Sequence, residues 1–110
     1  MSNDELSLRT LLIAIDTITE YSQTSTTADN FYHDRKSFDA CMIHFINIGE
    51  MIERLSVDFK TSHDDIPWQE IKNFRNLVAH NYFGIDADEI WDIIQNHLPT
   101  LKQNIHSLLL

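Results

Sequence analysis

Glycine, proline and cysteine are scarce in this 110-residue sequence, which contains two, two and one of them, respectively. So few turn-forming residues favour a few long helices over many short strands. The single cysteine, Cys41, excludes an internal disulfide and fits a reducing compartment. No apolar run approaches the roughly 18 residues that a membrane span needs, and no basic-then-apolar leader opens the chain. With 43% hydrophobic residues, we expect one folded domain over residues 1–110 that is soluble, cytoplasmic and not membrane-bound.

Positive charge is also scarce. Eight Lys and Arg stand against 17 Asp and Glu, which gives a net charge of -9. Taken globally, this argues against a nucleic-acid binder, because phosphates must be met by cations. The charge is uneven, however: residues 71–85 contain no acid, while Lys72, Arg75 and His80 lie among them. Chance and a partly buried helix explain this gap as well as a functional basic segment does.

Apolar residues recur with helical spacing in four stretches. The four main helices are predicted over residues 4–21, 37–59 and 67–80, and from a cap at Asp86 to about residue 108. Thr27 is expected to cap a short helical turn over residues 28–33, which Phe31 would anchor. Because no segment alternates convincingly as a strand, we predict an all-α fold, an up-and-down bundle of four main helices.

Three positions add detail to these helices. Gly49 lies within the second main helix, where it costs about 1 kcal/mol of helix propensity, so a neighbouring helix is expected to approach closely there. Glu89 follows the cap Asp86 by three residues, the spacing of a capping box. Pro99 is expected to kink the last helix, since proline removes a backbone hydrogen bond and clashes with the preceding turn.

The most informative segment is Arg-Asn-Leu-Val-Ala-His-Asn-Tyr, residues 75–82. Its cation, amide, imidazole and phenol suit the gripping of a phosphodiester and the transfer of protons to and from its oxygens. On a helix that turns about 100° per residue, Arg75 falls inside the apolar arc, whereas Asn76 and His80 share the other face. Either the long arginine stem snorkels to solvent, or this face packs against a second copy of the helix. In the second case Arg75 and the histidines of both copies would line one cleft.

One pattern in this segment resembles the signature of the HEPN superfamily. In it Arg75 and Asn76 are followed, after three residues, by His80 and, after one more, by Tyr82. The surrounding phrases narrow the resemblance to the HepT-like branch: Ile-Gly-Glu at residues 48–50, Ile-Pro-Trp at 66–68, Ala-His-Asn-Tyr-Phe-Gly at 79–84 and Trp-Asp-Ile-Ile-Gln-Asn-His-Leu-Pro at 91–99. The resemblance covers about residues 8–108. The arginine–histidine spacing alone is a weak pattern, but it is strong with these phrases in register.

This resemblance implies an all-helical homodimer or higher even-numbered oligomer that acts as a metal-independent ribonuclease toxin of a prokaryotic toxin–antitoxin pair and needs no cofactor. It also implies a partner, an MntA-like nucleotidyltransferase antitoxin that adds AMP to Tyr82. By the same resemblance, Arg75 would clamp the scissile phosphate of RNA, His80 would transfer the proton, and Asn76 would position the phosphate or the imidazole. Glu50 and Lys72 are candidates for supporting roles.

The remaining polar residues carry weaker signals. The other histidines show no metal-ligand spacing, so no metal site is expected. Glu50 has Arg54 four residues later, which is by default an ordinary helical ion pair, although the Gly-Glu phrase leaves a role in the cleft open. Trp68 and Trp91 are expected in the core, and Cys41 is expected to be inert packing. The acidic net charge keeps a second function class open, a non-catalytic module that binds nucleotide or a nucleotidyltransferase.

Overall fold

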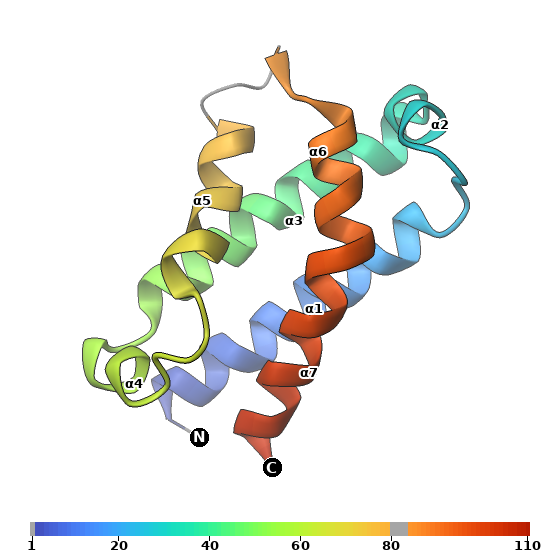
Figure 1. The fold of residues 1–110 in the computed structure, drawn as a ribbon. Coiled ribbons are helices and arrows are strands. Elements are labelled where there is room, and N and C mark those ends of the chain that lie inside the picture. Colours follow the sequence, from blue (N-terminus) through green and yellow to red (C-terminus); the bar gives the residue numbers. More distant parts are fainter. Residues whose placement is uncertain (1, 80–83) are drawn as a thin grey trace.

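The structure is a computed structural model that describes residues 2–79 and 84–110, and most of these residues are helical (Figure 1). The elements are α1 (Asn3–Ser22), α2 (Ala28–His33), α3 (Arg35–Arg54), α4 (Val57–Ser62), α5 (Trp68–Ala79), α6 (Ala87–Asp92), the π-helical turn η2 (Ile93–His97) and α7 (Leu98–Leu109). No strand occurs among the described residues. Counting α6, η2 and α7 as one continuous helix, the predicted all-α fold with four main helices is confirmed.

The main helices alternate in direction, as in an up-and-down bundle (Figure 1). Helices α1 and α3 pack side by side, α5 lies along α3, and α6 to α7 cross α1 with α2 at their upper end. Each main helix contributes to one core, whose fully buried side chains include Leu11, Ile18, Phe31, Phe45, Ile48, Ile90, Leu98 and Ile105. No helix among the described residues is both long and apolar enough to cross a membrane.

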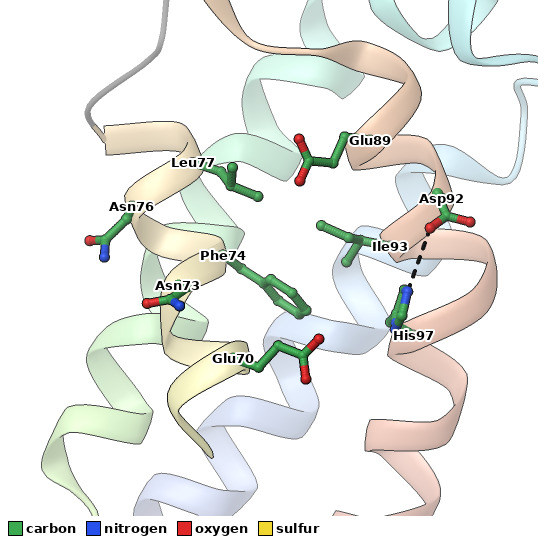
Figure 2. Close-up of a pocket in the computed structure, with 9 residues that line it drawn as sticks. All are labelled: Glu70, Asn73, Phe74, Asn76, Leu77, Glu89, Asp92, Ile93 and His97. Carbon is green, nitrogen blue, oxygen red and sulfur yellow. Dashed lines mark ion pairs between the residues drawn. The ribbon is translucent and has the colours of Figure 1, made fainter. Parts of the chain in front are cut away.

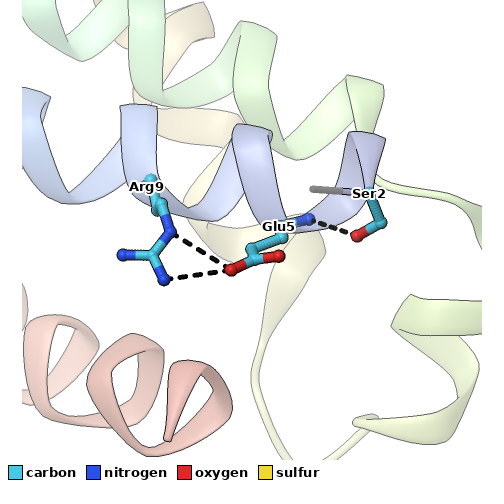
Figure 3. A network of polar contacts seen from close by, with 3 residues as sticks. All are labelled: Ser2, Glu5 and Arg9. Atoms are coloured by element: carbon cyan, nitrogen blue, oxygen red, sulfur yellow. Dashed lines mark hydrogen bonds and ion pairs between the residues drawn. The ribbon is translucent and has the colours of Figure 1, made fainter.

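Side-chain caps define where several helices begin. Ser2 accepts a hydrogen bond from the backbone N–H of Glu5 at 3.0 Å, and the Glu5 carboxylate pairs with Arg9 at 3.0 Å one turn later (Figure 3). The caps predicted at Thr27 and Asp86 are confirmed, because both side chains accept N–H groups of the first turn of their helices. Such caps satisfy backbone donors that have no partner within the helix.

The second main helix is shorter than predicted. It ends at Arg54 rather than at residue 59, and Leu55 takes an extended conformation before α4 begins. The hydroxyl of Ser56 caps α4, and Asp4 of α1 accepts both the N–H of Ser56 at 2.8 Å and its hydroxyl at 2.7 Å. These bonds satisfy the backbone at the break. Phe59 of α4 still packs against the core, which is why the apolar spacing continues past the end of the helix.

The interruption predicted at Pro99 takes the form of a π turn. The residues of η2 immediately precede Leu98, and Pro99 then occupies the first turn of α7. A proline in an α-helix lacks the N–H that would bond one turn back, and its ring crowds that turn. A π turn, with its wider i to i+5 bonding, is one way in which a helix accommodates such a break.

The close approach predicted at Gly49 is confirmed, and the neighbouring helix is α5. A Cβ atom added to Gly49 would overlap the Cβ of Arg75 and would lie 3.0 Å from its Cδ and 3.2 Å from its Cγ. The absence of a side chain at this position therefore lets α5 rest directly on α3, with the arginine stem over the glycine.

Replacing Gly49 with alanine should lower the free energy of unfolding by about 1–2 kcal/mol. Alanine gains about 1 kcal/mol of helix propensity. Overpacking costs about 1–3 kcal/mol, and the upper half of that range applies here because a Cβ fixed to the backbone of α5 cannot move aside as a flexible tip would. Urea denaturation of both proteins measures the difference. Gly84→Ala is the control, because among the described residues no atom beyond the chain neighbours lies within 4 Å of a Cβ there. Equal stability of Gly49→Ala and the parent would contradict the close contact.

Candidate functional site

Arg75 lies on the face of α5 that packs against α3. Its stem covers Gly49, and its Nε lies 2.9 Å from the Oε1 of Glu50, with 39% of the side chain exposed. The Nε atom lacks a hydrogen bond of good geometry to any described residue, so its contact with Glu50 is an ion pair. Within one copy of the chain, the arginine thus has a covered stem and a charged end at the surface, as the snorkelling interpretation expects. A second copy of the helix at this face stays a prediction.

Glu50 does not make the expected helical pair with Arg54. It reaches across to α5 instead, because Gly49 brings the two helices close enough for a carboxylate of α3 to meet the guanidinium. The default interpretation of Glu50 is therefore wrong, and the structure places this residue beside Arg75.

A second ion pair lies next to the first, between Glu53 of α3 and Lys72 of α5, with Oε2 and Nζ 2.5 Å apart. Gly49 and the four charged residues line an open hollow of about 210 Å³ between the two helices. Lys72 was predicted from the sequence as a supporting residue, but Glu53 was missed. The signal that could have found it is the spacing of Glu53, three residues after Glu50, which puts both carboxylates on one side of α3.

The electrostatics of Glu53 follow from this arrangement. The hydrogen bond from Lys72 holds the pKa of the Glu53 carboxyl below its usual range, and the charges of Lys72, Lys60 and Arg75 act in the same direction. Two acids of α3, Glu50 and Glu53, thus lie beside the two cations of α5, in the stretch of sequence that has no acids of its own. Its cations Lys72 and Arg75 are neutralised in the folded chain rather than free.

Asn76 lies on a different side of α5. It borders a groove of about 470 Å³ between α5 and the α6–η2 segment (Figure 2). Phe74, Leu77 and Ile93 supply the apolar surface of this groove, and the acids around it are Glu70, Glu89 and Asp92. Figure 2 shows Phe74 pointing into the groove, while Asn76 is directed away from its centre.

Of the residues that the sequence predicts for the catalytic site, the structure describes Arg75 and Asn76, and these two do not border the same pocket of a single chain. Arg75 borders the hollow on α3, and Asn76 borders the groove opposite. This agrees with the helical projection, which separated the two. His80 and Tyr82 lie outside the described residues, so their predicted roles are not tested.

The other candidate residues have packing roles or no shared site. Burial raises the pKa of the Cys41 thiol to about 12, as expected of inert packing. Trp68 is buried and Trp91 packs against the core beside Phe31, as predicted. Among the described residues, no three His, Cys, Asp or Glu side chains gather as metal ligands would.

Comparison with known proteins bears on the resemblance noted in the sequence. A family model described as Ribonuclease HepT-like matches residues 11–108. The chain belongs to the HepT-like family. No solved structure matches it.

Curated relatives of this HepT-like chain carry ribonuclease names. "Probable ribonuclease HepT" of Thermococcus cleftensis is 33% identical over 95 residues, which cover 86% of each chain. A Methanocaldococcus jannaschii protein named "Gamma-glutamylcyclotransferase and putative RNase" is 32% identical over 98 residues, 89% of this chain. The match spans only 44% of that relative's length.

Replacing Lys72 with methionine should raise the pKa of Glu53 toward its usual range, because the lysine hydrogen bond is the main cause of the lowered pKa. A carboxyl whose pKa is lowered by folding adds stability above its unfolded-state pKa, and this contribution is lost as the pH falls through the folded-state value. An NMR titration of the Glu53 carboxyl in both proteins measures the change. Lys102→Met, which breaks the separate Lys102–Asp16 pair, should leave Glu53 as it is; the same low pKa in Lys72→Met would refute the assignment.

Proposed function

We propose that this HepT-like chain is a metal-independent endoribonuclease, the toxin of a prokaryotic toxin–antitoxin system. The observation that carries the proposal is the placement of Arg75, whose stem is fixed over Gly49 and whose charged end stays at the surface. A planar guanidinium held in this way can bind two oxygens of a phosphodiester and stays charged throughout a reaction. Membership of the HepT-like family and the names of the relatives support RNA as the substrate.

The chemistry needs only groups that the chain contains. The 2′-hydroxyl of RNA attacks the adjacent phosphorus and the bond to the 5′-oxygen breaks, which leaves a 2′,3′-cyclic phosphate and a 5′-hydroxyl. His80 transfers the proton, since an imidazole with a pKa of about 6.5 serves as base or acid near neutrality. Arg75 neutralises charge on the phosphorane, and Asn76 positions the imidazole or the phosphate.

The active form in this proposal is a homodimer. Arg75 and Asn76 border different hollows of one copy, so a single α5 does not present them to one phosphate. Two copies of α5 that meet near their C-terminal ends bring the arginine of one within reach of the histidine and asparagine of the other. The complete site then exists only between subunits.

Regulation in this proposal passes through Tyr82. An MntA-like nucleotidyltransferase antitoxin joins the phenol oxygen of Tyr82 to the α-phosphorus of ATP, and pyrophosphate leaves. The added AMP places bulk and negative charge near Arg75 and His80, where it blocks the cleft and repels RNA.

A specific observation favours the alternative, a non-catalytic module that binds nucleotide or a nucleotidyltransferase. Both Lys72 and Arg75 are paired with glutamates, and the groove on the other side of α5 is acidic. Neither feature attracts RNA strongly. Under this alternative Arg75 and His80 serve recognition alone.

His80→Ala should reduce RNA cleavage about 100- to 10,000-fold, the range for loss of a general acid or base. The assay incubates purified protein with RNA in EDTA and identifies the 2′,3′-cyclic phosphate ends by mass spectrometry. His106→Ala, at an exposed histidine of α7, is the matched control and should cleave at the parental rate. No cleavage of any RNA by the parent, together with tight binding of nucleotide or of the nucleotidyltransferase, would favour the non-catalytic module.

Tyr82→Phe should remove the acceptor of AMP and leave the fold intact. With the cognate nucleotidyltransferase and ATP, the parent should gain the mass of AMP and lose its RNase activity, whereas the variant should gain no mass and stay active. Tyr21→Phe, at an exposed tyrosine of α1, is the control and should be modified as the parent is. AMP found on Tyr82→Phe would show that another residue is the acceptor.

A further inference from the structure

The surface between α3 and α5 carries two ion pairs arranged in parallel. Glu50 pairs with Arg75 at 2.9 Å and Glu53 pairs with Lys72 at 2.5 Å. On each helix the two residues are three positions apart, so they are neighbours on one face. The pairs therefore lie side by side along the same open hollow, which Gly49 completes.

Both cations in this hollow are accessible to a ligand. The side chain of Lys72 is 34% exposed and that of Arg75 is 39% exposed. Ion pairs at such exposure contribute little net stability, because water and salt screen them. A phosphodiester carries the same charge as a carboxylate, so it can replace the glutamate on each cation at small cost.

The two faces of α5 differ in charge, which selects the path of a nucleic-acid strand. On the side of α6, the groove is surrounded by Glu70, Glu89 and Asp92, with no Lys or Arg among its described lining residues. On the side of α3, cations match the acids, and Lys60 of α4 adds to the positive charge around Glu53. A polyanion therefore meets less repulsion along the α3 side.

We propose that Lys72 forms a second phosphate subsite next to Arg75, and that Glu53 masks it in the free protein. The inference rests on the proposed function: with the scissile phosphate on Arg75, a neighbouring phosphate of single-stranded RNA binds Lys72. Glu53 must turn away from Lys72 when the strand binds. Lys72 is a positioning residue, since it holds the strand and touches no reacting bond.

The two masks leave the hollow without net charge in the free protein, because Glu50 and Glu53 each face one cation. A cation that is already paired must give up its carboxylate before it can neutralise a phosphate and release that phosphate's counterion, so random polyanions gain little by binding. Only a strand that fills both subsites together displaces both carboxylates. The arrangement therefore binds a single phosphate weakly and favours extended single strands that reach both subsites.

Binding of a fluorescent 2′-O-methyl RNA oligonucleotide tests the subsite, because this probe lacks the attacking hydroxyl and stays intact on the parent protein. Lys72→Met should weaken binding several-fold and reduce the slope of log affinity against log salt by about 0.7, the value for one phosphate contact on a single strand. Glu53→Gln should strengthen binding about twofold to fivefold. In the double variant most of that gain should vanish, because the mask acts through Lys72.

A second Lys–carboxylate pair supplies matched controls of the same charge change. Lys102 of α7 pairs with Asp16 of α1 at 2.7 Å, away from the hollow. Lys102→Met and Asp16→Asn correct for the general effect of net charge on RNA binding. The subsite is refuted if Lys72→Met weakens binding no more than Lys102→Met does, or if Glu53→Gln strengthens it no more than Asp16→Asn does.

Kinetics with cleavable RNA separate the subsite from the proposed function. Lys72→Met should raise KM several-fold with kcat unchanged, as expected for contacts made equally in the ground and transition states. A fall in kcat at constant KM would overturn the positioning role. If the parent cleaves RNA but Lys72→Met matches its control, the subsite alone is wrong. If the binding effects appear but no RNA is cleaved, the subsite stands and the nuclease proposal is wrong.

Discussion

The site depends on the contact between Gly49 and Arg75. Without a side chain at position 49, α5 approaches α3 so closely that the arginine stem lies on the glycine backbone. The same approach puts Glu50 beside the guanidinium and Glu53 beside Lys72. Any larger residue would push the helices apart and separate both ion pairs, so one missing methyl group sets the geometry of four charged side chains.

Much of the fold could be predicted from the sequence because helices leave local patterns in it, such as apolar periodicity and capping residues. The apolar periodicity located the four main helices, and Thr27 and Asp86 marked helix starts that the structure confirms. The predicted end of the second main helix was wrong. The break at Leu55 depends on Asp4, which lies more than 50 residues earlier in the chain. Local periodicity carries no information on such a bond.

The directions of the site residues on α5 were predictable from the sequence, but their partners on α3 were not. The spacing of Arg75 and Asn76 on one helix gave their separate directions, and the structure agrees. The partners on α3 could not be derived in this way, since the choice between Arg54 and Arg75 for Glu50 depends on how near α5 comes. Gly49 was the clue to that distance, but a glycine in a helix does not say which residue of the neighbour fills the space.

The π turn before Pro99 also corrects the direction of the last helix. The core residues Ile90, Ile94 and Leu98 follow one another in steps of four, and on a straight α-helix two such steps drift about 80° around the axis. The wider turn of η2 takes up this drift, so all three side chains point inward. A sequence one residue shorter in this stretch could keep the same core with an ordinary α-helical turn. Length differences between relatives are therefore tolerable here, at a point inside a continuous helix, as well as in loops.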